Sequence, residues 1–341
     1  MRRQLFVFLS VCVIVVTTMV IVPRSAVGQD TATVPQTSWG VPDLQGIWTF
    51  RTITPLERPR ELADKQELTE EEAAAYELQE ARRQNRDLID SEQGGLNYAP
   101  ESEGGIVPYN EFWYDRGTTV IASRRTSLII NPPDGRLPPF TAEGQRRADA
   151  QREIGRQEQR GRPLADGPED RDVGDRCILG FNAGPPMLPG GYNQNVQIFQ
   201  TADYVVVYNE MIHNARVIPL DGGSHGTLRQ WSGDSRGRWD GDTLVVDTIN
   251  FSGETSLNGS SPSMHLVERF TRVNADMVTY AVTVANPDTW TRSWTAEIPL
   301  MQLDDQVPQM YEYACHEGNY SMDTILRGAR LEEKAATQVG R

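Results

Sequence analysis

The chain of 341 residues has few of the side chains on which most enzyme mechanisms depend. Lys65 and Lys334 are its only lysines, so a lysine Schiff-base mechanism has almost no candidate residue. There is no Gly-x-Ser-x-Gly nucleophile elbow, no P-loop, no dinucleotide-binding fingerprint after a predicted strand, and no Cys-x-x-Cys-His haem motif. These absences argue against serine nucleophiles and redox cofactors.

Positive charge is also scarce. The 33 Lys and Arg residues face 47 Asp and Glu residues, for a formal net charge of −14 at pH 7. Such a balance disfavours binding to nucleic acid and to anionic membrane surfaces. We therefore predict a small-molecule substrate or ligand as the partner, with no nucleic acid and no membrane. The oligomeric state is left open by the sequence.

Only the N-terminus carries a long apolar run. Arg2 and Arg3 precede an uncharged segment over 5–22, and Ala26 and Gly28 are small residues where a signal peptidase reads them. We predict a signal peptide over 1–28 and a periplasmic or extracellular protein. A retained membrane anchor is the alternative, because the run approaches the length of a span.

Cleavage leaves Cys177 and Cys315 as the only cysteines. In an oxidising compartment this pair predicts a disulfide. The bridge would constrain the unfolded chain by about 4–5 kcal/mol in the entropic description. Two separate buried thiols are one alternative. A nucleophilic Cys315 beside His316 is another, although adjacent residues of a strand point to opposite faces.

The rest of the chain predicts a single β-rich domain over 46–331, after a polar segment over 29–45 and before a tail over 332–341. Helical insertions are expected near 57–90, where Thr69 and Glu72 form a capping box, and near 141–160. Short strands separated by Asp-Gly and Asn-Gly turns follow from Val196. The expected strands include 211–219, 243–249, 265–273 and 310–315. The fold class is mainly β, an antiparallel calycin-like barrel or sandwich with two peripheral surface helices.

Several segments resemble a family of predicted secreted bacterial proteins. They are Pro-Pro-Met-Leu-Pro at 185–189, Met-Ile-His-Asn-Ala-Arg at 211–216, Arg-Trp-Asp-Gly-Asp-Thr-Leu-Val-Val-Asp-Thr at 238–248, His-Leu-Val-Glu-Arg-Phe at 265–270 and Tyr-Glu-Tyr-Ala-Cys-His-Glu at 311–317. The resemblance implies export and no particular activity. Gly-Ser at 223–224, before His225, departs from the Arg-Pro pair of the family. Gly-Ile-Trp at 46–48 also resembles the opening Gly-x-Trp of lipocalins and other calycins, which favours a barrel.

The four histidines all lie between Cys177 and His316, among the predicted strands. Alternation of side chains places His213, Asp247 and Glu268 each on an apolar-looking strand face. Buried charges need partners, so we expect these three groups to meet one another, Arg216 or Arg269. An imidazole beside a carboxylate serves as a general base, and a carboxyl group in an apolar pocket serves as an acid.

The function favoured by this pattern is a secreted, cofactor-free acid–base enzyme acting on a small organic molecule in a β-barrel cavity. It would be a hydrolase, lyase, isomerase or cyclase. The predicted catalytic residues are His213 as base, Glu268 or Asp247 as acid or orienting group, and Arg216 or Arg269 as anion stabiliser. The predicted substrate-binding residues are Trp113, Tyr208, His265 and Trp290. One alternative is a non-catalytic calycin-like ligand-binding protein, and another is an envelope protein whose polar groups form a structural ion-pair network.

No cofactor is predicted. A divalent metal such as zinc is the alternative, with imidazole ligands drawn from His213, His225, His265 and His316. The spacings match neither His-Glu-x-x-His nor Cys-x-x-Cys. Calcium bound by Asp234, Asp240 and Asp242 is a further alternative, although an Asp-Gly hairpin turn explains Asp240 more simply.

Overall fold

The computed structural model describes residues 34–94, 100–103, 109–159, 165–255, 257, 259–303 and 310–339. The predicted signal peptide over 1–28 lies outside these ranges, as do the first residues of the polar segment that follows it. None of the helices in the described ranges combines the length and the apolar character that crossing a bilayer requires.

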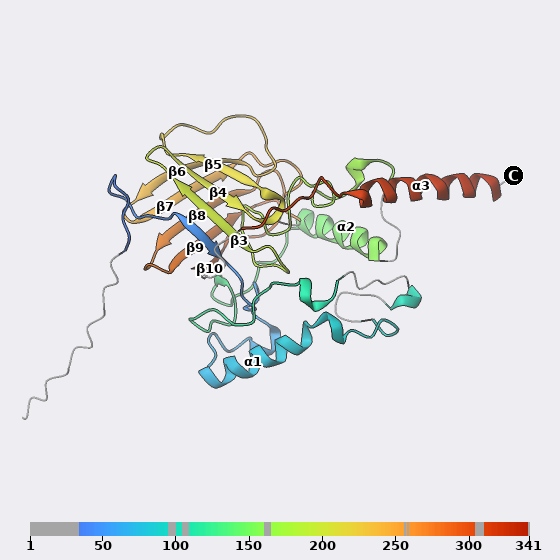
Figure 1. Ribbon diagram of the computed structural model, residues 1–341, viewed down its shortest axis with the longest axis horizontal. Helices are drawn as coiled ribbons and strands as arrows, with labels where there is room; N and C mark the ends of the chain where they lie inside the picture. Colours follow the sequence, from blue (N-terminus) through green and yellow to red (C-terminus); the bar gives the residue numbers. More distant parts are fainter. Residues whose placement is uncertain are drawn as a thin grey trace, which may run out of the picture. The chain divides into compact units, whose positions relative to one another are not determined.

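A single antiparallel sheet dominates the protein (Figure 1). Nine strands succeed one another across it in the order β5-β4-β3-β1-β10-β9-β8-β7-β6, and β2 pairs with β10 off this path. The strands are β1 (Gly46–Thr49), β2 (Ile129–Asn131), β3 (Asn195–Gln200), β4 (Tyr204–Asn209), β5 (Ala215–Pro219), β6 (Asp234–Asp240), β7 (Thr243–Ile249), β8 (His265–Arg272), β9 (Met277–Ala285) and β10 (Trp294–Gln302). This confirms the predicted mainly β, antiparallel class.

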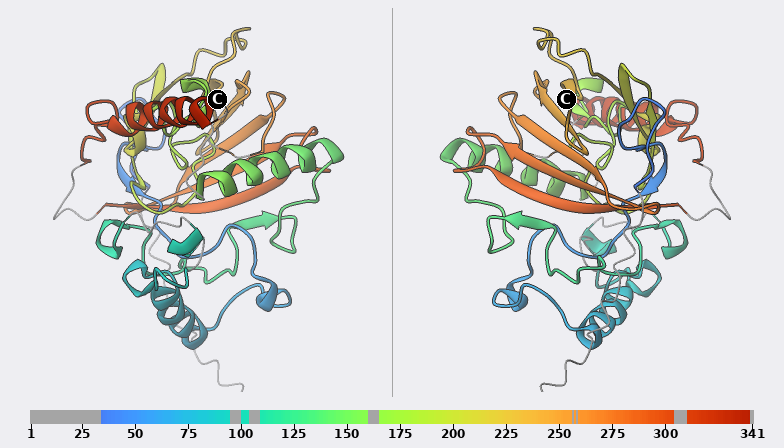
Figure 2. Two further views of the ribbon diagram at one scale, coloured as in Figure 1. Left: turned by 90° about the vertical axis from the view of Figure 1, so that its right-hand side faces the viewer. Right: turned by 90° about the vertical axis from the view of Figure 1, so that its left-hand side faces the viewer.

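The sheet curves strongly (Figure 2), and its two edge strands, β5 and β6, pack against each other through side chains. Arg216 Nη1 on β5 lies 3.4 Å from Ser235 Oγ on β6. A side chain at Gly237 would collide with Leu220 and Ile218, so glycine permits this close approach. The described pairings include no ladder between β5 and β6. The sheet is thus a nearly closed barrel.

Regular alternation of buried and less buried side chains along the strands builds the core. β9 contributes Val278, Tyr280, Val282 and Val284, each fully shielded from solvent. Trp48 of the Gly-x-Trp triplet is also fully buried. Its Nε1–H donates to the carbonyl of Leu44 at 3.0 Å. These side chains occupy the barrel interior, where the sequence had led us to expect a ligand cavity.

The two predicted helices are present. α1 (Glu70–Arg83) begins at the expected capping box, where Thr69 Oγ1 accepts from the Glu72 N–H at 3.2 Å and Glu72 Oε2 accepts from the Thr69 N–H at 2.8 Å. α2 (Ala142–Gln159) fits the insertion expected near 141–160. A third helix, α3 (Tyr320–Val339), was not predicted. The side chain of Asn319 caps its first turn by accepting from the Met322 N–H at 3.4 Å.

Of the strands named from the sequence above, two differ in the structure. The segment expected as a strand over 211–219 begins instead with a tight turn, Met211–His213, and β5 starts only at Ala215. The segment over 310–315 forms no strand. Its position is set by a covalent link at Cys315 rather than by ladder hydrogen bonds.

Candidate functional site

Glu268 lies inside the barrel, where Arg216 and Tyr280 hold its carboxylate. Arg216 Nη2 donates to Glu268 Oε1 at 2.9 Å, and Arg216 Nη1 donates to Oε2. The Tyr280 hydroxyl donates to Oε1 at 2.9 Å. The side chain of Glu268 is 0% exposed and that of Arg216 is 5% exposed. A shielded, bidentate pair of this kind matches the structural ion-pair alternative.

Arg216 and Tyr280 both stay protonated at neutral pH. Burial lowers the pKa of Arg216, but the charge and hydrogen bonds of Glu268 outweigh it and raise the pKa above its ordinary value. Burial and the charge of Glu268 raise the pKa of Tyr280 well above its ordinary value. Neither group releases its proton near neutral pH. The network therefore suits a structural role better than proton transfer.

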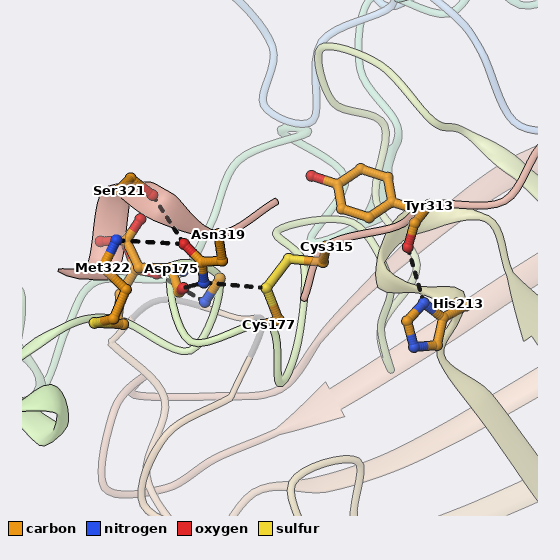
Figure 3. Close-up of a disulfide and its surroundings, with 10 residues drawn as sticks. Asp175, Cys177, His213, Tyr313, Cys315, Asn319, Ser321 and Met322 are labelled. Atoms are coloured by element: carbon orange, nitrogen blue, oxygen red, sulfur yellow. Dashed lines mark hydrogen bonds between the residues drawn. A yellow bond between two sulfur atoms is a disulfide. The ribbon is translucent and has the colours of Figure 1, made fainter. Parts of the chain in front are cut away.

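His213 lies in the turn before β5, close to the Cys177–Cys315 disulfide (Figure 3). Its Nδ1–H donates to the carbonyl of Tyr313 at 2.9 Å, so the neutral ring carries its lone pair on Nε2. Ile212 and His213 have φ angles of 55° and 42°, in the left-handed region that β-branched residues avoid. His213 is exposed whereas Glu268 is fully shielded. The expectation that they meet in one cavity is wrong.

The predicted disulfide between Cys177 and Cys315 is confirmed, with their Cα atoms 5.7 Å apart. It links the loop before β3 to the segment before α3. Asn319 Nδ2 reinforces this link by donating to the carbonyl of Asp175 at 2.7 Å. In the bridge Cys315 has no free thiol, so it is not the nucleophile of the alternative considered above.

Asp247 lies on the outer wall of the barrel, and two imidazoles share its carboxylate. His225 Nε2 lies 2.8 Å from Oδ1, and His265 Nε2 lies 2.7 Å from Oδ2. The second ring nitrogen of His225 faces Asp234 Oδ2 at 3.3 Å, and this oxygen also accepts from the Gly226 N–H at 2.6 Å. We call His225, Asp234, Asp247 and His265 the outer-wall cluster.

Strand register explains why Asp247 and Glu268 are on opposite sides of the barrel wall. The β7–β8 ladder pairs Val246 with Glu268 and Asp247 with Val267. Because neighbouring residues of a strand point to opposite faces, Glu268 points into the core and Asp247 points outward. His265, two residues before Val267, shares the outer face with Asp247. The expected common cavity for His213, Asp247 and Glu268 does not form.

The cluster is polar and accessible. Burial raises the pKa of Asp247, but hydrogen bonds and charge from His265 and His225 outweigh it and leave the pKa below its ordinary value. The carboxylate is therefore ionised at neutral pH and accepts an N–H from each ring. The side chain of His265 is 45% exposed, against 19% for His225. With Nε2–H directed at Asp247, the neutral His265 ring carries its lone pair on Nδ1.

His213 and the outer-wall cluster lie at the same end of the barrel. Ladder partners place Asp234 at the start of β6 beside Ile249 at the end of β7. Arg216 contacts Ser235, so β5 begins at this end too. Asn214 Nδ2 lies 3.5 Å from Ser232 Oγ and joins the turn of His213 to the segment before β6. Residues far apart in the sequence are thus gathered at one barrel end.

The other predicted site residues have different surroundings. Arg269 points outward and its Nη2 lies 3.1 Å from Asp240 Oδ2. Trp113 is 61% exposed and packs edge-on against Phe112. Tyr208 is half-buried on the outer face of β4, and Trp290 is buried in the core. Of the four predicted substrate-binding residues, only His265 belongs to the outer-wall cluster.

Metal binding was the alternative use of the histidines. Within the described ranges, no group of three or more His, Cys, Asp or Glu side chains is arranged to hold a metal ion. In the outer-wall cluster both ring nitrogens of His225 and Nε2 of His265 face carboxylate oxygens.

Comparison of the chain with protein-family models found no match, and a search of curated proteins found none. The geometry of the site is therefore the basis for inferring function.

Sequence reasoning missed the acid–base partners of Asp247. His225 was considered only as a metal ligand and Asp234 only as a calcium ligand. Glu210 was missed altogether: it is buried at the turn before His213, and Asn195 Nδ2 donates to its Oε2 at 2.9 Å. Burial raises the pKa of Glu210.

Proposed function

We propose that this protein is an exported acid–base enzyme that acts on a small organic molecule, with His265 as the residue that exchanges the proton. The observation that supports the proposal is the sharing of the Asp247 carboxylate by His265 and His225, at 2.7 and 2.8 Å. A carboxylate that holds an imidazole in one tautomer leaves the opposite ring nitrogen ready to accept a proton near neutral pH.

The neighbouring groups have supporting roles in this proposal. His225 lies between two carboxylates, and its imidazolium form donates to both Asp234 and Asp247. It is a positioning residue that keeps Asp247 aimed at His265. Arg236 is the cross-strand neighbour of Asp247 and takes the anion-stabilising role first assigned to Arg216 and Arg269. Hydrolysis, elimination, isomerisation and cyclisation all need the proton transfer that such a site provides.

The disulfide supports export, because structural disulfides persist in oxidising compartments. We accordingly propose a periplasmic or extracellular location. A small-molecule substrate fits the acidic composition, and we propose no requirement for a cofactor.

The test is a turnover screen followed by proton NMR in D2O. The panel contains aryl esters, lactones, 3-hydroxy acids and 2-oxo acids, so that hydrolysis, elimination and bare C–H exchange each produce a signal. For any substrate that reacts, His265→Gln is expected to lower kcat about 100-fold or more, the usual contribution of a positioned general base. Asp247→Asn is expected to lower kcat by a smaller factor and to change the pH profile.

His316→Gln is the matched control, because His316 is a second exposed histidine outside the cluster. It should retain wild-type turnover. His213→Ala shows which of two accessible imidazoles at this end of the barrel, His213 or His265, acts as the base. Full activity in His265→Gln together with loss of activity in His213→Ala would move the reaction from the outer-wall cluster to the turn beside the disulfide.

A further inference from the structure

A cavity of different chemistry lies between α1 and the loop that precedes β3. Its volume is about 490 Å³, which is in the range of small-molecule sites. The walls come from residues 52–56, from the second half of α1 and from residues 188–191, with Tyr114, Arg116, Leu128 and Phe181 among the remaining lining residues. It shares no residue with the outer-wall cluster, so it does not depend on the proposed function.

The charged lining of this cavity is predominantly positive. Arg83, Arg86 and Arg116 face it together with one carboxylate, Glu80. Glu80 is already neutralised, because Arg83 Nε donates to its Oε1 at 2.7 Å and Arg83 Nη2 donates to its Oε2 at 2.5 Å. Arg116 in turn pairs with Glu111, so an anion in the cavity depends on an unsatisfied N–H group rather than on a surplus of charge.

One nitrogen of the Arg116 guanidinium is left unsatisfied by the part of the chain that the structure describes. Its Nη1 pairs with Glu111, while its Nη2 is shielded from solvent and has no hydrogen-bond partner among the described residues. The guanidinium lies 4.2 Å from the centre of the Tyr114 ring, which restricts its movement. A shielded N–H without an acceptor costs free energy, and an oxyanion beside it would remove that cost.

The uncharged lining suits a flat, apolar body. Tyr76, Tyr114 and Phe181 supply aromatic surface, and Leu188 and Ile53 supply aliphatic surface. Burial, followed by the charge of Glu80, raises the pKa of Tyr76 to about 12. Its phenol therefore keeps its proton at neutral pH and is able to donate a hydrogen bond into the cavity.

We propose that this cavity binds a small aromatic carboxylate, with the carboxylate on Arg116 and the ring against Tyr114 and Leu188. With Nη1 paired to Glu111, Nη2 offers the carboxylate a charged hydrogen bond, and the apolar wall distinguishes this ligand from a bare inorganic anion. The site therefore provides a ligand-binding activity in addition to acid–base chemistry.

Isothermal titration of the full protein with 2-naphthoate tests the proposal. Arg116→Gln should weaken binding about tenfold or more, as expected for loss of a charged hydrogen bond. Arg116→Lys, which keeps the charge but replaces the planar guanidinium with an ammonium group, should have an affinity between those of the wild type and Arg116→Gln. Arg152→Gln is the matched control, since Arg152 is an exposed α2 arginine paired with Asp149. It should bind like the wild type, as should His265→Gln.

Two further ligands test the two halves of the site. 2-Naphthalenemethanol, which has the ring without the charge, should bind at least tenfold more weakly than 2-naphthoate. Inorganic phosphate, which has charge without a ring, should not displace 2-naphthoate at equal concentration. Equal binding of 2-naphthoate by wild type and Arg116→Gln, no binding by the wild type, or displacement by phosphate would each overturn the proposal. If Arg116→Gln does not fold, Leu188→Trp decides: it fills the apolar wall and must abolish binding, and retained binding refutes the site.

Discussion

Replacing Glu268 with Gln tests the view that the buried network is structural. The substitution keeps the shape of the side chain but leaves the charge of Arg216 without its counter-charge inside the barrel, where Arg216 is only 5% exposed. Breaking a buried pair by removing one partner typically costs about 3–5 kcal/mol. With a urea m-value of about 3 kcal/mol/M, this loss lowers the unfolding midpoint by about 1–1.7 M.

The assay is urea unfolding at pH 7 with the disulfide intact, followed by tryptophan fluorescence and circular dichroism. Tyr280→Phe supplies an internal scale, because it removes one of the three hydrogen bonds to Glu268 and should cost only about 1–3 kcal/mol. The double variant Arg216→Met with Glu268→Leu replaces the ion pair with apolar side chains. It should be much more stable than Glu268→Gln, since well-packed apolar replacements of buried pairs are often close to neutral.

Two results would refute this reasoning. The first is a Glu268→Gln protein within about 1 kcal/mol of the wild type, which would mean that water or another group compensates Arg216. The second is a double variant whose loss equals the sum of the losses measured for Arg216→Met and Glu268→Leu alone. That would mean that the two side chains do not act as a pair.

Three further predictions concern groups elsewhere in the structure. Because the pKa of Asp247 is lowered, its ionised form stabilises the fold at pH values above its ordinary pKa of 3.8. This stability is lost as the pH falls through the lower pKa of the folded state. Asp247→Asn should therefore unfold at lower urea than the wild type at pH 7, by about 1 kcal/mol or less for a partly exposed pair, with the gap closing towards pH 2. The raised pKa of Glu210 has the opposite effect on stability. The protonated side chain stabilises the fold fully below pH 4.5, and this stability is lost as the pH rises through the higher pKa of the folded state. Glu210→Gln should thus have a higher melting temperature than the wild type at pH 8 and no advantage at pH 4, and a growing disadvantage with rising pH would contradict this. Replacing Cys315 with Ser should lower the free energy of unfolding by about 2–5 kcal/mol, measured against the oxidised wild type, and an unchanged midpoint would show that the bridge closes no costly loop.

Much of the fold was predictable because its signals are local. The capping box of Thr69 and Glu72 starts α1 where expected, and the Asp240-Gly241 turn joins β6 to β7 with Gly241 at a φ of 58°. The disulfide was predicted from the two cysteines that would remain after cleavage of the predicted signal peptide. The turn at Met211–His213 was missed because a β-branched residue such as Ile212 normally favours a strand, and tertiary contacts overrode that preference.

The candidate site was harder to predict because it depends on register. Within each strand the alternation was read correctly, with Asp247 on the face of Val245 and Glu268 on the face of Leu266. The inward orientation was predicted correctly for Glu268 and wrongly for Asp247. The loop between β7 and β8 is long, so no turn geometry in the sequence fixes the pairing of Val246 with Glu268. A single-residue difference in this pairing would exchange the inner and outer faces.

The amino-acid sequence alone determined the β class, the acidic character, the covalent link and the stretch of chain that holds all the histidines, since composition and local pattern specify these properties. The tertiary structure decided which charges became core and which became surface. Curvature of the sheet brought β5 against β6 and enclosed Arg216 with Glu268, while the ladder between β7 and β8 turned Asp247 outward to His225 and His265. The Arg216–Glu268 pair joins β5 to β8, which are distant in sequence, and only the nearly closed barrel brings them together.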